Sequence, residues 1–281
     1  MFTRVVTILS LFLTTTAGLL SVDGVGAAGS IIIAGNGPEL PTIERLARAF
    51  EKSHRGSVVE IQWDQYSDPI ALVKSGDAHV AVTGRAAPNL AAIPIAWDGI
   101  AVVVYIANPT KEVTTQQVAD IFSGKLKRWA ELSGQESVIQ LIDRPSYQNI
   151  RQGLEEGLNI VGLIPSSAQV IRSDQRAMST VAGSVSAVSY ASLKPALEAV
   201  KYGVDVNLLV IDHIEAAEET VRDGRYTLRR PVLLLTRRES NPVAESFAVF
   251  ALSKEGQEIV AEMFTSYRSL DKWKPGEGLK H

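Results

Sequence analysis

Residues 120–132 read D-I-F-S-G-K-L-K-R-W-A-E-L, and this stretch says most about how the chain folds. Val118 and Phe122 lie one helical turn apart and predict the apolar side of an amphipathic helix. Gly124 ends that helix, because glycine readily adopts the left-handed conformation found just after a helix. Trp129 follows at a fixed offset and is expected to pack back as an anchor. Spacing alone therefore predicts a helix, a stop and a buried tryptophan.

The composition around this stretch is that of an ordinary globular protein. The chain has 281 residues, 46% of them apolar and 21% charged, which is enough for one large domain or two modest ones. Its net charge of −3 argues against a nucleic-acid-binding protein and against a polybasic membrane-surface protein. A local basic pocket remains compatible with this overall charge.

Several kinds of chemistry have no support in the sequence. The chain contains no cysteine, which excludes disulfides, zinc–thiolate sites and a thiol nucleophile. None of the histidines has a second ligand at metal-binding spacing; they are His54, His79, His213 and His281. No G-x-S-x-G elbow marks a nucleophile and no P-loop is present. We therefore expect no catalytic residues, no metal site and no cofactor.

The N-terminus has the layout of a secretory signal peptide. Arg4 provides the positive start, Val5 to Leu20 are largely apolar, and residues 25–28 are small enough for cleavage. The apolar core is short for a membrane span, although an uncleaved anchor is the alternative. No cysteine follows it, which excludes a lipoprotein. The sequence predicts a cleavable signal at residues 1–28 and a mature protein in the periplasm.

The remaining chain alternates between short apolar runs and amphipathic segments. A helix is also expected after an N-cap at Thr114. The other expected helices are 40–50, 69–74, 149–158, 242–250 and 256–264, and the expected strands are 30–35, 58–61, 79–82, 96–106, 138–142, 186–190, 206–211 and 229–235. This alternation predicts an α/β protein with mostly parallel sheets.

Residues 120–132 resemble the D-I-F-x-G-x-x-x-x-W-x-E-L signature of phosphate-type (PstS-like) periplasmic substrate-binding proteins, the capture subunits of ABC importers. The motif identifies a family better than a ligand, since none of its residues is an obvious ligand group. Other stretches are similar to elements of the same family: 31–50, 74–85, 94–104, 223–231 and 253–257. The resemblance therefore covers most of the mature chain.

The resemblance implies a two-lobed periplasmic-binding-protein fold of type II. Each lobe would be a sheet flanked by helices, and two crossover strands would join them. Residues 29–107 and 229–281 would form lobe 1, and residues 108–228 would form lobe 2. It also implies a monomer that captures a small oxyanion, most simply phosphate, and docks on an ABC permease in the inner membrane, without binding nucleic acid.

The family's ligand loops in lobe 1 correspond to three loops of this chain. An oxyanion site uses helix N-termini, small hydroxyl groups and arginine. Asn36 and the Gly37 backbone occupy the first loop, Ser67 the second, and Thr83 and Arg85 the third. Arg85 has two open interpretations, because it either enters the cleft or faces solvent.

The residue that follows the first loop carries charge of the wrong sign for an anion site. Glu39 favours the start of a helix through the helix dipole, but it would oppose an anion held close by. Asp68 in the second loop is expected to cap a helix.

The corresponding loop of lobe 2 departs most from the family. Its motif is R-x-x-x-S-G-T, and here Arg144 is present but the triplet has become Gln148-Asn149-Ile150. Gln148 and Asn149 can still donate through their amides, and Ser146 lies one loop earlier. The region is either an ordinary helix start or a pocket remodelled for another ligand. Arg144, Ser146, Gln148 and Asn149 complete the candidate ligand set.

A second functional hypothesis keeps the fold without transport. The chain would then serve as a sensory or protein-interaction module with a poorly donating cleft. An exposed apolar patch would favour it.

Overall fold

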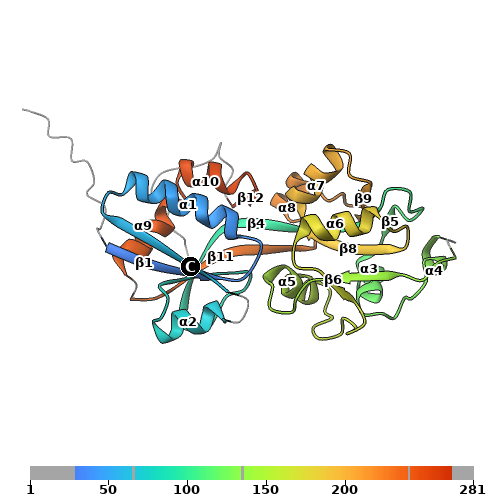
Figure 1. The fold of residues 1–281 in the computed structure, drawn as a ribbon, viewed down its shortest axis with the longest axis horizontal. Helices are drawn as coiled ribbons and strands as arrows, with labels where there is room; N and C mark the ends of the chain where they lie inside the picture. Colours follow the sequence, from blue (N-terminus) through green and yellow to red (C-terminus); the bar gives the residue numbers. More distant parts are fainter. Residues whose placement is uncertain (1–28, 65–66, 134–135, 240, 268–281) are drawn as a thin grey trace, which may run out of the picture.

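The computed structural model describes residues 29–64, 67–133, 136–239 and 241–267. Two α/β lobes lie side by side and are joined by two long strands (Figure 1). The predicted signal peptide and the last residues of the chain lie outside the described residues.

Lobe 1 is a mixed sheet with helices on both faces. Its elements are β1 (Gly29–Gly35), α1 (Leu40–Ser53), β2 (Ser57–Trp63), α2 (Pro69–Ser75), β3 (Val80–Thr83), α9 (Pro242–Ala251), α10 (Lys254–Val260) and β12 (Thr265–Ser266), together with the nearer parts of β4 (Leu90–Tyr105) and β11 (Arg229–Arg237). Alternate strand residues face opposite sides, as the two-residue period of a strand requires. Ile33 and Val82 pack with α1, α9 and α10, whereas Ala34 and Ala81 pack with α2.

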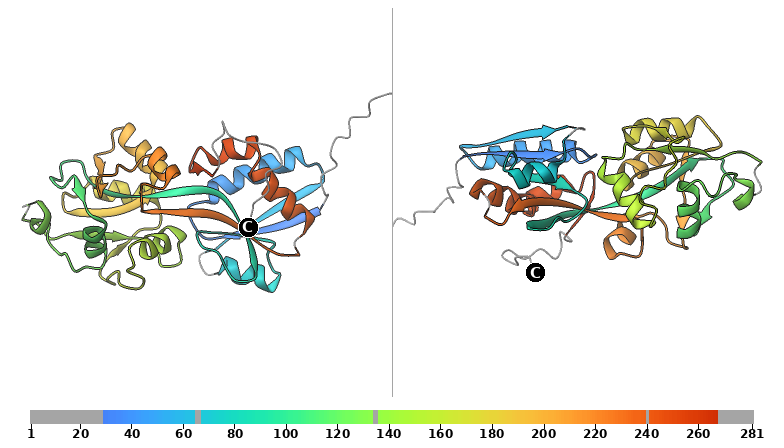
Figure 2. Two further views of the ribbon diagram at one scale, coloured as in Figure 1. Left: turned by 180° about the vertical axis from the view of Figure 1, so that it is seen from behind. Right: turned by 90° about the horizontal axis from the view of Figure 1, so that it is seen from below.

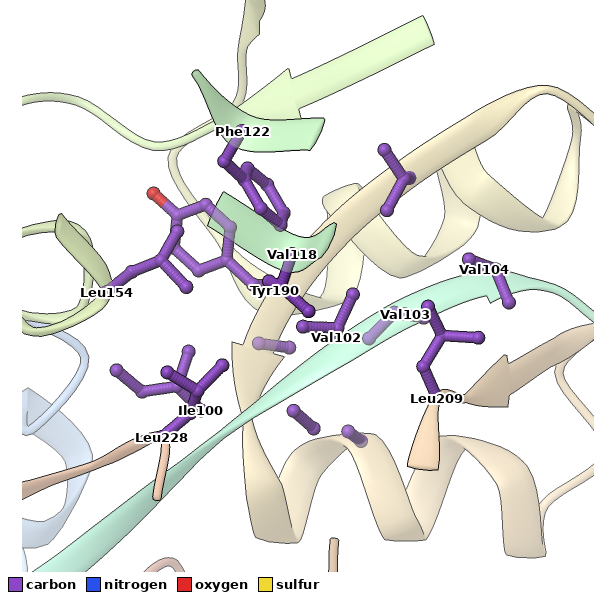
Figure 3. Close-up of a cluster of buried hydrophobic side chains, with 14 of the residues drawn as sticks. Ile100, Val102, Val103, Val104, Val118, Phe122, Leu154, Tyr190, Leu209 and Leu228 are labelled. Atoms are coloured by element: carbon purple, nitrogen blue, oxygen red, sulfur yellow. The ribbon is translucent and has the colours of Figure 1, made fainter. Parts of the chain in front are cut away.

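Lobe 2 has a larger helical content around a shorter sheet. Its elements are β5 (Glu112–Val113), α3 (Thr115–Phe122), α4 (Ala130–Ser133), β6 (Gln140–Asp143), α5 (Asn149–Gly157), β7 (Gln169–Val170), α6 (Asp174–Ala182), β8 (Ala187–Ser192), α7 (Leu193–Lys201), β9 (Val206–Leu208), β10 (Val210–Ile211) and α8 (Glu218–Asp223), with the far part of β4. Figure 3 shows its core, in which Phe122 and the ring of Tyr190 lie together above Val102 of β4. Burial of these side chains is the main stabilising term for the lobe.

The two lobes share β4 and β11, which pair antiparallel as they cross (Figures 1 and 2). Asp98 lies opposite Arg230 in this ladder. Ala96 belongs to the core of lobe 1, while residues 100–104 belong to the core of lobe 2. Gly99 follows Asp98 in β4 and packs tightly there, since a Cβ at this position would lie 2.6 Å from Val221 Cγ2 of α8. The crossing point thus places Asp98 and Arg230 between the lobes.

The D-I-F-S-G-K-L-K-R-W-A-E-L motif at residues 120–132 has the predicted local structure. α3 begins with a capping box in which the Thr114 and Gln117 side chains bond each other's backbone N–H groups. It ends at Phe122, and Gly124 has a φ of +70°. Trp129 is fully buried, and its indole N–H donates to the carbonyl of Ser186 at 2.9 Å. All three expectations are confirmed.

Other expectations need correction. Half of the described strand pairs are antiparallel, because β4 and β11 run against their neighbours, so the prediction of mostly parallel sheets is wrong. The expected strand at 206–211 divides into β9 and β10, and the last helix begins at Lys254 rather than Gly256. Helices α6, α7 and α8 were not expected.

None of the helices among the described residues is both long enough and apolar enough to cross a lipid bilayer.

Candidate functional site

A cavity of about 270 Å³ lies between the lobes beside the crossing strands. Its walls come from the loops after β1 and β3, the start of α2, and the start of α5 in lobe 2. The lining residues are Asn36, Ser67, Asp68, Pro69, Ile70, Thr83, Arg85, Tyr147, Asn149 and Gln152. Most of these side chains are polar, which suits a small polar ligand better than an apolar one.

Lobe 1 supplies hydroxyl and amide groups to this cavity. The Ser67 hydroxyl donates to Asp64 Oδ2 at 3.0 Å, and the oxygen of Thr83 accepts from the Arg85 N–H at 3.4 Å. The Thr83 hydroxyl proton can therefore still be donated to a ligand. Asn36 Oδ1 is buried without a hydrogen-bond partner. Arg85 is exposed at the rim, and Asp68 caps α2 as predicted, by accepting from the Ile70 N–H.

Lobe 2 faces the cavity with the N-terminus of α5. Gln148 is the N-cap residue, but its side chain makes no capping hydrogen bond. Asn149, the first residue of the helix, is 4% exposed and its Nδ2 has no partner. A helix N-terminus carries unpaired N–H groups and a partial positive charge. Asn149 therefore adds a buried donor to a helix end that already favours anions.

The structure brings five of the nine candidate ligand residues to this cavity: Asn36, Ser67, Thr83, Arg85 and Asn149. Gly37 and Gln148 line a neighbouring cavity of about 410 Å³ on another side of the lobe junction. Ser146 is exposed and lines neither cavity.

Arg144 also lines neither cavity. Its Nη2 is 2.9 Å from Asp174 Oδ1 and donates to the Tyr190 carbonyl at 2.6 Å. The side chain is buried inside lobe 2. Its charge is engaged by Asp174 of α6, so a ligand in the cleft would meet Arg144 only after this pair separated.

A buried ion cluster joins the lobes at the crossing point. Arg230 Nη1 lies 2.6 Å from Glu39 Oε1, and Arg230 Nη2 lies 2.8 Å from Asp98 Oδ2. The Ser192 hydroxyl, at the end of β8 in lobe 2, donates to Asp98 Oδ2 at 2.9 Å. Burial raises the pKa of the Asp98 carboxyl to about 6, although Arg230 and Ser192 act in the opposite direction. The cluster thus links lobe 1, both crossing strands and lobe 2.

Sequence reasoning gave no role to Asp98 or Arg230. Two signals were available. Asp98 interrupts the apolar strand A-W-D-G-I-A-V-V-V, and Arg230 lies in the family-like stretch 223–231. A charge inside a buried strand needs a buried partner. Glu39 is the partner of Arg230 in lobe 1. It was expected to favour the start of a helix and to oppose an anion, and its pairing with an arginine was not expected.

The raised pKa of Asp98 leads to a prediction about stability. The pKa of Asp98 is 3.8 in the unfolded chain and about 6 in the folded protein. At pH values between these two, the folded protein binds a proton at Asp98 that the unfolded chain releases. Asp98 therefore contributes stability that is present at low pH and is lost as pH rises through about 6. From about pH 7.5 to 4.5, the wild type should gain about 2 kcal/mol relative to Asp98→Asn, which lacks this titration. Urea unfolding at both pH values measures the difference, and parallel pH profiles would contradict it.

Comparison with known proteins identifies the family. A family model described as a PBP superfamily domain matches residues 23–255, which is most of the chain. The chain belongs to the PBP superfamily. The PBP superfamily fold accounts for the two lobes and the crossing strands, and it makes the chain a binding protein rather than an enzyme.

Relatives within the PBP superfamily give a narrower comparison. The chain is 34% identical over 113 residues to "Phosphate-binding protein PstS 2" of Streptococcus agalactiae, covering 38% of this chain and 39% of the relative. It therefore spans about two fifths of the length of that relative. It is 22% identical over 244 residues to "Phosphate-binding protein PstS" of Bacillus subtilis, covering 83% of this chain and 79% of the relative.

Solved structures agree on the fold. A putative phosphate ABC transporter substrate-binding protein with bound phosphate from Clostridium perfringens superposes with a TM-score of 0.74 and 27% identity. That match covers 85% of this chain and 100% of the other chain. A phosphate transport receptor from Vibrio cholerae gives the same TM-score of 0.74 at 23% identity, which supports the fold alone.

Proposed function

We propose that this protein is an extracytoplasmic solute-binding protein of the phosphate-importer type, which captures a small oxyanion, inorganic phosphate first, between its lobes. The observation that carries the proposal is the convergence of five of the nine candidate ligand residues on one cavity that has walls from both lobes. The named relatives and the phosphate-bound structure of similar fold support the choice of phosphate.

The chemistry of the cavity is suited to an oxyanion. The Asn149 side chain and the N-terminus of α5 line it from lobe 2, while Thr83 and Arg85 line it from lobe 1. A ligand that touches both walls favours the closed arrangement of the lobes over the open one, which is the condition for ligand-driven closure.

The setting of this function is part of the same proposal. The protein would be exported by a signal peptide at residues 1–28, work as a monomer in the periplasm, and pass its ligand to a permease in the inner membrane. Along the sequence we propose lobe 1 as 29–107 with 229–281 and lobe 2 as 108–228; within the crossing strand β4, residues 100–104 of the lobe 1 segment pack into the core of lobe 2.

Titration calorimetry with inorganic phosphate tests the function directly. The purified protein should show saturable binding of one phosphate. Absence of any heat or thermal stabilisation at millimolar phosphate would remove the assignment.

Arg85→Gln should weaken phosphate binding about tenfold, because it removes a charge-assisted hydrogen bond at the cavity rim. Arg55→Gln is the matched control, since Arg55 is exposed in the turn between α1 and β2 and does not line the cavity. Equal affinities for the two variants would show that Arg85 faces solvent and takes no part in binding.

A further inference from the structure

The buried cluster at the lobe junction has an unbalanced charge. Glu39 and Asp98 are two carboxylates, and both pair with one guanidinium, that of Arg230. The other acid that faces Asp98 is Asp174, and its charge is engaged by Arg144. With both carboxylates of the cluster ionised, Glu39, Asp98 and Arg230 carry a net charge of about −1 in a region shielded from water.

Glu39 lies where the helix N-termini of the two lobes meet. It is the N-cap of α1, and its side chain makes no capping hydrogen bond. Its Oε2 atom is fully buried without a partner, as is Nδ2 of Asn149 at the start of α5. A Cβ added to Gly37 would meet Glu39 Oε2 and lie 3.0 Å from Asn149 Nδ2, so these two unpartnered atoms border the same small space.

The cluster lies next to the loop that carries Thr83 and Arg85, two residues that line the cavity proposed for the ligand. A Cβ added to Gly84, between Thr83 and Arg85, would lie 3.5 Å from Arg230 Nη1 and 3.7 Å from Asn149 Cβ. Gly84 thus lies beside both the Arg230 guanidinium and the Asn149 side chain. An anion in the cavity would therefore lie close to the excess negative charge of the cluster.

We propose that Glu39 is a built-in anion at the lobe junction, which weakens capture of fully deprotonated oxyanions and makes their capture depend on uptake of one proton by the Glu39–Arg230–Asp98 cluster. This inference rests on the proposed function. A proton on the Asp98 carboxylate neutralises the cluster, and an incoming anion favours that protonated state.

The surroundings of the cluster determine where the proton is held. Asp98 faces Arg230, Glu39, Asp174 and the Ser192 hydroxyl, and burial is the largest influence on it, raising its pKa to about 6. A nearby anion raises that pKa further. Proton uptake on binding is therefore expected at and above neutral pH, and the affinity should decrease as the pH rises.

Calorimetry with inorganic phosphate at about pH 5.5 and 8, in buffers with different ionisation enthalpies, tests the proposal. Glu39→Gln keeps the size of the side chain and removes one charge. It should bind phosphate on the order of tenfold more tightly than the wild type at the higher pH, and should take up fewer protons. The titration of phosphate itself is common to both proteins, so it does not contribute to the difference between them.

Two further variants control the interpretation. Glu258→Gln makes the same chemical change at an exposed position in α10 and should match the wild type. Asp98→Asn removes the other negative charge and should also tighten binding at high pH, which keeps the proposal testable if Glu39→Gln fails to fold.

The outcomes separate this proposal from the proposed function. In one outcome the wild type binds phosphate, and Glu39→Gln and Asp98→Asn bind it equally well or more weakly, with unchanged proton uptake. That result overturns the role of Glu39 and leaves the proposed function intact. No phosphate binding by any variant at either pH overturns oxyanion capture itself, and this inference with it. Binding by Glu39→Gln at high pH where the wild type binds weakly supports both.

Discussion

Replacing Arg230 with methionine is expected to lower the free energy of unfolding by about 3–5 kcal/mol. The substitution keeps an apolar stem of similar length but leaves Glu39 and Asp98 as buried carboxylates without a cation. Burying an unpaired charge is costly, because water no longer solvates it and nothing replaces the lost hydrogen bonds. The loss should be largest at neutral pH and smaller in acid, where the Asp98 carboxylate binds a proton.

Urea unfolding followed by circular dichroism measures this change. Arg225→Met is the control, since Arg225 also pairs with two acids, Asp223 and Glu219, but its side chain is 53% exposed. It should change stability by less than about 1 kcal/mol, as exposed ion pairs usually do. Similar losses for the two variants would show that the buried cluster does not hold the lobes together.

Replacing Trp129 with alanine is expected to cost about 3–5 kcal/mol of stability. The ring is fully buried in the core of lobe 2, and its N–H donates to the Ser186 carbonyl at 2.9 Å. The truncation removes the contacts of the ring, leaves a cavity behind it and leaves a buried carbonyl without its donor.

Thermal and urea unfolding test the role of Trp129, with Tyr202→Ala as the matched aromatic control. Tyr202 is 77% exposed at the end of α7 and should change stability by less than about 0.5 kcal/mol. A loss below about 1 kcal/mol for Trp129→Ala would mean that the tryptophan of the motif is not an anchor.

Much of the fold follows from local sequence. The apolar run at 30–35, the helical spacing from Leu40 to Phe50 and the stop at Gly124 each reflect local geometry, and each has the predicted structure. Helices α6 to α8 were not predicted; all three pack against β4, and such tertiary packing is the main source of helix stability in proteins. Antiparallel pairing of β4 and β11 depends on residues far apart in sequence, which no local pattern reports.

The candidate site was predictable where a loop follows an identifiable strand or precedes an identifiable helix. Asn36, Thr83 and Asn149 are of this kind, and the structure brings them to one cavity. Arg144 lies outside that cavity because Asp174, in the unexpected helix α6, pairs with it. The sequence alone showed that Glu39 carries the wrong charge for an anion site. Its burial depends on Arg230, which lies 191 residues away in the chain.

A crystal structure of the protein grown with inorganic phosphate tests oxyanion capture most directly. The expected result is one phosphate in the cavity between the lobes, within hydrogen-bond distance of Thr83 and Asn149, with the buried Glu39–Arg230–Asp98 cluster intact beside it. A phosphate bound elsewhere on the molecule, or an empty cavity in crystals saturated with phosphate, would contradict oxyanion capture between the lobes.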